Sequence, residues 1–116
     1  MSSKRVFRIN NLIKRELGEI IIRELGLKGI LTTITRVESS NNLSQAKIYI
    51  SVIPEEKEEE VLELLNKDIY RIQQKLNKRI KIKFVPKIIF LREKKTKEAD
   101  RVERILEKIK KSSLEK

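Results

Sequence analysis

AKIYISV, at residues 46–52, alternates between apolar and polar side chains over its whole length. Its apolar members occupy every second position: Ala46, Ile48, Ile50 and Val52. Successive side chains of a β-strand point to opposite faces of a sheet, so this alternation predicts a strand with one buried face and one face toward water. The neighbouring segments indicate what this strand pairs with and what covers it.

A second strand is predicted just upstream at residues 31–37, where the sequence LTTITRV is rich in Thr, Ile and Val. The connection between the two strands contains the turn formers Ser39, Ser40, Asn41 and Asn42. The two strands are therefore expected to form an antiparallel hairpin. Before them, residues 5–25 carry apolar side chains at steps of three and four, which predicts a long amphipathic helix that ends at Gly26.

Downstream, Pro54 opens a predicted helix whose first turns hold the acidic run at residues 55–60. Proline is tolerated at a helix start, and carboxylates there complement the positive end of the helix dipole. An apolar stripe continues to Leu76, and with no Gly or Pro to mark a break, the segment is either one helix or two that meet near Asp68.

A third strand is expected over residues 80–90, because apolar side chains again occupy alternate positions. Phe84 and Phe90 belong to this apolar set and are predicted to lie in the core. Pro86 interrupts the pattern and favours an edge position or a bulge.

The order of elements is thus α-β-β-α-α-β or the same with a single central helix. A right-handed helical crossover returns the third strand parallel to the second. The predicted fold class is α+β, with a three-stranded mixed sheet covered on one face by helices. Residues 1–93 form the predicted domain, and residues 94–116 form a charged tail, partly helical or disordered, with an amphipathic pattern from Val102 to Ile109.

Missing residue types exclude most enzyme classes. The chain has no His and no Cys, which excludes the usual zinc sites, Ser-His-Asp triads and thiol nucleophiles. It also lacks a phosphate-binding P-loop and a dinucleotide fingerprint. No apolar run is long enough to span a bilayer. A non-catalytic protein without cofactor or metal is expected, monomeric and cytoplasmic, with no membrane contact.

Positive charge is concentrated in one part of the chain. The net charge is +11, and residues 67–97 hold twelve bases against two acids. On a continuous helix Lys67, Arg71, Lys75 and Lys78 would share one narrow stripe. Such a row is typical of a surface that contacts a phosphate backbone, so RNA binding is predicted. The candidate residues are Arg5, Arg8, Lys67, Arg71, Lys75, Lys78, Arg79, Lys81 and Lys83.

Two other readings of the charge remain open. The basic face could meet an acidic protein, with residues 55–60 as a second docking site, or the protein could compact DNA. Tyr49 and Tyr70 are candidates to meet a base, although the chain has too few aromatic residues for a stacking sheet.

Several ordered stretches resemble the ribosome-binding factor A family, over roughly residues 5–93. They are RV at 5–6, TTI at 32–34, VE at 37–38 with Ser40, Leu43 followed by AKIYIS at 46–51, and KIKFVPKIIF at 81–90. The resemblance implies a type II KH-like fold and no catalysis. It implies binding to the small (30S) ribosomal subunit and its 16S rRNA in late maturation, with importance in the cold and an assembly GTPase as a further partner.

One departure concerns the helices around Asp68. KH domains carry GxxG between their paired helices, and the resembling family usually carries Ala-x-Gly. Here Asp68, Ile69 and Tyr70 stand in that place, so neither motif is present.

Overall fold

A three-stranded sheet forms the centre of the protein, seen in a computed structural model that describes residues 4–26 and 28–93. β1 (Leu31–Ser39) pairs antiparallel with β2 (Gln45–Ile53), and β3 (Lys87–Arg92) lies parallel to β2 on its other side. The strand order is therefore β1-β2-β3. The predicted hairpin, the parallel return of the third strand and the mixed sheet are all confirmed.

A bulge in β1 changes which side chains face water. The register with β2 shifts between Ile34 and Arg36, so that Ile34 pairs with Ile50 and Arg36 with Tyr49. Ile34 and Ile50 are buried, whereas Arg36 is exposed. The bulged Thr35 thus lets β1 keep its apolar side chains toward the core on both sides of the irregularity.

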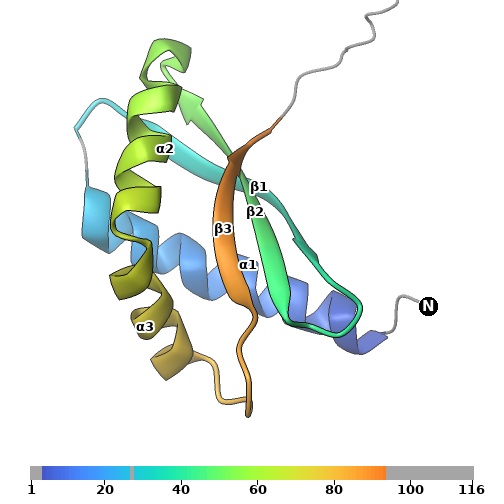
Figure 1. Ribbon diagram of the computed structural model, residues 1–116. Helices are drawn as coiled ribbons and strands as arrows, with labels where there is room; N and C mark the ends of the chain where they lie inside the picture. Colours follow the sequence, from blue (N-terminus) through green and yellow to red (C-terminus); the bar gives the residue numbers. More distant parts are fainter. Residues whose placement is uncertain (1–3, 27, 94–116) are drawn as a thin grey trace, which may run out of the picture.

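Three α-helices accompany the sheet: α1 (Lys4–Leu25), α2 (Glu58–Lys67) and α3 (Ile69–Arg79), with a short 3-10 turn at Glu55–Lys57 before α2. In Figure 1, α1 crosses behind the sheet, and α2 and α3 follow one another beside β3. The α+β architecture with the order α-β-β-α-α-β is confirmed.

The question of one helix or two is settled at Asp68. This residue has φ −101° and ψ 15°, outside the helical region, and separates α2 from α3. Its φ is negative, so the break does not require the left-handed conformation that favours glycine. The Arg71 guanidinium donates to the Asp68 carboxylate at 2.7 Å, which ties the first turn of α3 to the break.

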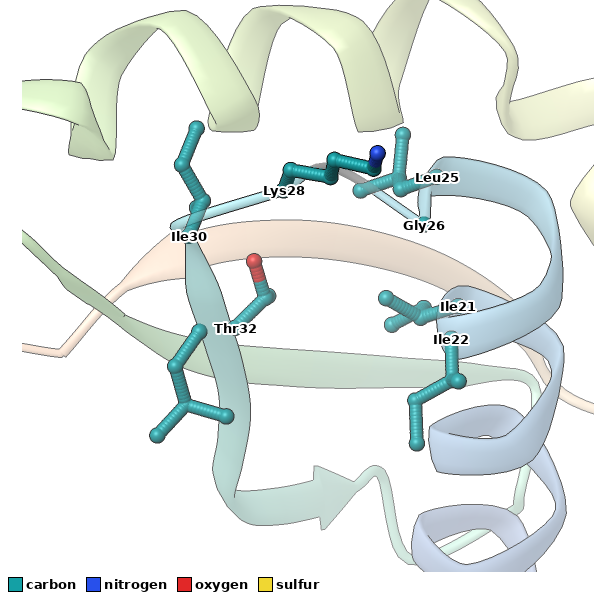
Figure 2. A pocket seen from close by; sticks show the side chains of 8 residues that line it. Ile21, Ile22, Leu25, Gly26, Lys28, Ile30 and Thr32 are labelled. Carbon is teal, nitrogen blue, oxygen red and sulfur yellow. The ribbon is translucent and has the colours of Figure 1, made fainter.

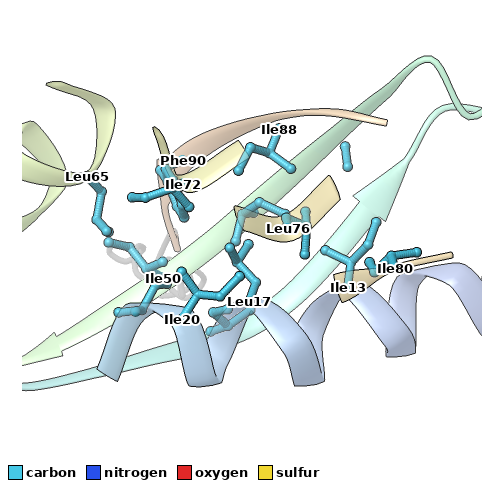
Figure 3. Packing of buried hydrophobic residues seen from close by; sticks show 14 of the residues in the cluster. Ile13, Leu17, Ile20, Ile50, Leu65, Ile72, Leu76, Ile80, Ile88 and Phe90 are labelled. Carbon is cyan, nitrogen blue, oxygen red and sulfur yellow. The ribbon is translucent and has the colours of Figure 1, made fainter. Parts of the chain in front are cut away.

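The core lies between the helices and the inner face of the sheet (Figure 3). Every second residue of β2, from Ala46 to Val52, is buried, as the alternation predicted. Facing them, α1 contributes Ile13 and Leu17, and α3 contributes Leu76. Phe90 of β3 is among the largest fully buried side chains.

Side-chain amides cover the outer edge of β3. The Asn66 amide bonds both backbone groups of Phe90, donating to its carbonyl at 3.3 Å and accepting from its N–H at 3.4 Å. Further along the same edge, the Gln73 amide donates to the Pro86 carbonyl at 3.1 Å and accepts from the Ile88 N–H at 2.9 Å. These two amides occupy the positions that a further strand would use.

The prediction of a strand over residues 80–90 is wrong in its first half. β3 begins at Lys87, and residues 80–86 form a loop. Pro86 has no N–H to donate, and pairing with β2 starts directly after it. Phe84 in this loop is 76% exposed, so its predicted core position is wrong, whereas that of Phe90 is confirmed. The predicted tail at residues 94–116 lies outside the described residues.

Candidate nucleic-acid interface

The nine predicted RNA-binding residues fall on three helices and one loop. Arg5 and Arg8 lie in the first turns of α1, and Lys67 is the last residue of α2. α3 carries four of them: Arg71, Lys75, Lys78 and Arg79. Lys81 and Lys83 lie in the following loop, not on the outer face of a strand as predicted. Because of the break at Asp68, the expected stripe from Lys67 to Lys78 is divided between two helices.

Two cations of α3 face the acidic side of α1. Arg71 lies 3.0 Å and Lys75 3.2 Å from the carboxylate of Glu24, whose side chain is only 17% exposed. Arg71 also contacts Asp68. The sequence did not predict these ion pairs between helices. They partly neutralise the row of cations on α3, which was expected to face solvent.

Arg79 is held in the same way further along α3. Its guanidinium lies 3.0 Å from Glu16 and 2.7 Å from Glu19, both on α1. The hydrogen bond from Arg79 is the main reason that the pKa of Glu16 is lowered from its ordinary value of 4.5, against a smaller opposing effect of burial. Together with the Glu24 pairs, this contact fixes α3 against α1.

This helix contact predicts an acid-sensitive contribution to stability. The pKa of Glu16 is lower in the folded protein than in the unfolded chain, so its contribution is present above pH 4.5 and is lost as the pH falls through the folded pKa. Arg79→Gln is therefore expected to reduce the difference in unfolding free energy between about pH 6 and pH 3. Urea denaturation at the two pH values measures it.

Lys78 provides the matched control for this prediction. It neighbours Arg79 on α3 and has no ion pair with any residue in the described part of the chain. Lys78→Gln should leave the acid sensitivity as in the wild type. Equal behaviour of the two variants would contradict the assignment of the effect to the Arg79–Glu16 contact.

Two of the remaining candidates, Arg5 and Arg8, lie at the other end of α1. Arg5, Arg8 and Arg15 line a cleft of about 450 Å³ together with Ile9, Asn11, Leu12 and Ile82. Ile82 stands between Lys81 and Lys83 in the loop, so two further predicted cations precede and follow a lining residue of this cleft in the chain. We call the seven lining residues the arginine cleft. Within residues 4–26 and 28–93, Arg5, Arg8, Lys81 and Lys83 make no ion pair.

Sequence reasoning missed part of this cleft. Arg15 was not among the candidates, although Arg5, Arg8, Leu12 and Arg15 follow the spacing of one helix face. That spacing was a usable signal. Ile82 gave none, because its alternation with lysines resembled a strand. Phe84, exposed in the same loop with the Lys83 ammonium 5.6 Å from its ring, was wrongly assigned to the core.

The two tyrosines singled out as base contacts differ in their surroundings. Arg36 covers the Tyr49 ring, with its guanidinium carbon 3.8 Å from the ring centre. The same Arg36, together with Thr35, donates hydrogen bonds to Glu93. Burial raises the pKa of the Glu93 carboxyl, but these hydrogen bonds outweigh burial and hold that pKa below its ordinary value. The Arg36 guanidinium thus occupies one side of the Tyr49 ring, whereas Tyr70 on α3 is 76% exposed.

A second pocket, of about 420 Å³, lies where α1 ends and β1 begins (Figure 2). Its lining is largely aliphatic, with Ile21, Ile22 and Leu25 from α1 and Ile30 before β1. Lys28 is its one ionisable lining residue. Ile22 and Arg8 are fourteen residues apart on α1, or about 21 Å along the helix axis, so this pocket is separate from the arginine cleft.

The described segments contain neither a cluster of candidate metal ligands nor a membrane-spanning helix. They contain no cluster of three or more acidic side chains placed to hold a metal ion. No helix within them is both long and apolar enough to cross a membrane.

Comparisons with known proteins agree on one family. The family model of ribosome-binding factor A matches residues 5–106. Ribosome-binding factor A of Halothermothrix orenii is 34% identical over 112 residues, which cover 95% of this chain and 92% of the relative. That of Lactobacillus acidophilus is 37% identical over 117 residues, covering 97% of this chain and 95% of the relative.

Solved structures show the same relationship. The crystal structure of ribosome-binding factor A from Thermus thermophilus superposes with a TM-score of 0.64 at 26% identity, covering 75% of this chain and 94% of that one. A Thermus thermophilus homology model, fitted into a cryo-electron-microscopy map of a complex between the 30S subunit and the factor, has a TM-score of 0.60 at 26% identity. It covers 71% of this chain and 88% of that one.

Proposed function

The chain belongs to the ribosome-binding factor A family, and from this membership we propose that it binds the small (30S) ribosomal subunit as an assembly factor. The family is named for ribosome binding and not for a reaction, and the chain is a binding protein rather than an enzyme. We propose further that it contacts 16S rRNA during late maturation and rRNA processing.

The observation that carries this proposal is that cations without an ion pair in the described residues lie together near the start of α1. Arg5 and Arg8 from α1 and Ile82, flanked by Lys81 and Lys83, meet at the arginine cleft. Cations without acidic partners release bound counterions when they meet phosphates, which is the main source of affinity for a nucleic-acid backbone. Arg71, Lys75 and Arg79 hold α3 against α1, so their contribution to RNA contact is smaller in this proposal.

A rival function is a protein-interaction module whose basic face meets an acidic protein, with the acidic run at residues 55–60 as a second docking site. Glu58 of this run is buried and pairs with Arg92 at 3.1 Å, and Glu60 lies 3.7 Å from Lys57. Part of the run is therefore engaged within the domain, which weakens its role as a second docking site.

Sedimentation of cell lysate through a sucrose gradient tests the proposal. The protein is expected to co-migrate with small subunits and not with complete ribosomes, because an assembly factor leaves before the subunits join. Migration with neither particle, or with complete ribosomes alone, would contradict it.

Pull-down with and without ribonuclease separates this function from its rival. Nuclease treatment should abolish capture if RNA holds the protein, and should leave capture intact if an acidic protein does. A preference for duplex DNA over structured RNA at matched salt would instead favour DNA compaction.

Two finer points of the proposal come from the family resemblance: an assembly GTPase as a further partner and a greater need in the cold. The sequence pattern adds a cytoplasmic location, a monomeric state and residues 1–93 as the RNA-binding domain.

A further inference from the structure

We infer that the arginine cleft receives a single unpaired nucleotide of RNA, with the base against its aliphatic floor and the flanking phosphates against its arginines. The inference rests on the proposed function and names the part of the RNA that this surface recognises. Four properties of the cleft support it: its shape, its charge, its floor and its amide.

The shape comes from one face of α1 and the loop after α3. Arg5, Arg8, Leu12 and Arg15 lie within an arc of about 80° on the helix, at 100° per residue. Ile82 closes the cleft from the loop. Its volume of about 450 Å³ falls in the range of about 300–1,000 Å³ that is typical of small-molecule pockets, so one nucleotide fits.

The charge of the cleft is positive throughout. Its ionisable lining residues are three arginines, without an acid. Arg15 shares its charge with Glu16 at 3.2 Å, whereas Arg5 and Arg8 have no acidic partner in the described part of the chain. The two free guanidiniums can each donate a pair of hydrogen bonds to a phosphate, and their flat faces can also stack on a base.

The floor distinguishes an unpaired nucleotide from a duplex. Ile9, Leu12 and Ile82 provide an aliphatic surface, which phosphate contact alone would not require. In a duplex the base faces are stacked on one another and only the backbone and base edges are accessible. An unpaired base exposes both faces and gains affinity when it removes apolar surface from water.

Asn11 supplies the remaining group that a base would use. Its amide carries both donors and an acceptor, and it lines the cleft from the same helix. The amide can therefore bond the edge of a base that rests on the floor. A peptide made of acidic residues alone could satisfy the arginines but has no apolar side chain to cover the floor.

The test measures how two forms of RNA bind to the full chain by fluorescence anisotropy. The probes are a fluorescein-labelled, unstructured ten-nucleotide single strand of adenosine and uridine, and a ten-base-pair RNA duplex, at one salt concentration. Leu12→Ala and Ile82→Ala each remove part of the floor without changing the charge. Each is expected to raise Kd for the single strand by about fivefold, the size expected when roughly one to two methylene groups lose apolar contact, and to leave Kd for the duplex unchanged.

Ile22→Ala is the matched control, because it removes the same kind of side chain from the same helix within the other pocket. It should change neither Kd. Thermal unfolding checks that each variant is folded, and if Leu12→Ala is not, Ile82→Ala decides, since its side chain lies in a loop.

Two results would overturn the inference. One is an equal effect, or none, of the floor variants on single strand and duplex. The other is that a ten-residue polyglutamate peptide displaces the labelled single strand as effectively as unlabelled single strand does at the same concentration. Binding of the wild type to purified small subunits is measured alongside. If that binding holds while the floor variants show no selectivity, only the inference fails; if that binding is absent, the proposed function fails instead.

Discussion

Replacing Arg5, Arg8 and Lys83 with glutamate is expected to lower the affinity for purified small subunits by at least about 100-fold at 0.1 M salt. Each phosphate contact adds nearly one to the slope of log affinity against log salt. Three lost contacts at 0.1 M salt therefore account for a loss of affinity of about 100-fold or more. The slope itself should become shallower by about three. Filter binding or sedimentation at several salt concentrations measures both quantities.

The fold should survive this change. Arg5, Arg8 and Lys83 are exposed and have no ion pair within residues 4–26 and 28–93. The contact of Lys83 with the Phe84 ring is at the surface and contributes about 0.5–1 kcal/mol at most. A loss of binding can therefore be assigned to the interface and not to unfolding.

A charge-matched variant separates local contact from overall attraction. Lys14, Lys28 and Lys47 are also exposed and lie outside the arginine cleft. Their replacement by glutamate changes the net charge by the same amount but should cost much less affinity. If both triple variants lose the same affinity, the assignment of the RNA-binding surface to this end of α1 is wrong.

Phe90→Ala is expected to have the largest effect on folding, lowering the free energy of unfolding by about 3–5 kcal/mol. The ring is 1% exposed and lies within the cluster between the sheet and the helices. Its removal leaves a cavity next to the strand that Asn66 holds from outside. Since small domains are stable by only about 5–15 kcal/mol, the variant would lose a large part of the total.

Phe84→Ala provides the internal comparison. It is the same substitution six residues earlier, at a ring that is 76% exposed, and should change stability by less than about 0.5 kcal/mol. Urea denaturation of both variants measures the difference. Similar losses for the two would mean that the loop at residues 80–86 packs its ring into the core after all.

Local patterns were sufficient to predict most of the fold. The alternation at residues 46–52 and the helical spacing at residues 5–25 each reflect a burial pattern within one element. The same rule failed at residues 80–86, because a loop that buries Ile80 and leaves Lys81 exposed reproduces the alternation of a strand. Only Pro86 indicated where pairing could begin.

The site was harder to predict, because its organisation depends on residues far apart in the sequence. Glu16 and Arg79 are separated by 63 positions, and nothing near either one indicates that they meet. The same holds for Ile82 and Arg8, which share the arginine cleft. The sequence identified the basic residues, but only the packing of α3 on α1 shows which cations are held by carboxylates and which are free.

The amides of Asn66 and Gln73 also limit how copies of this protein could join to one another. These amides bond Ile88 and Phe90 on the outer edge of β3, and β1 forms the opposite edge of the described sheet. Two copies that met edge to edge through β1 would use both β1 edges and form a closed pair. Growth into a fibre needs a second open edge on every copy, and the two amides oppose such growth by bonding part of the β3 edge.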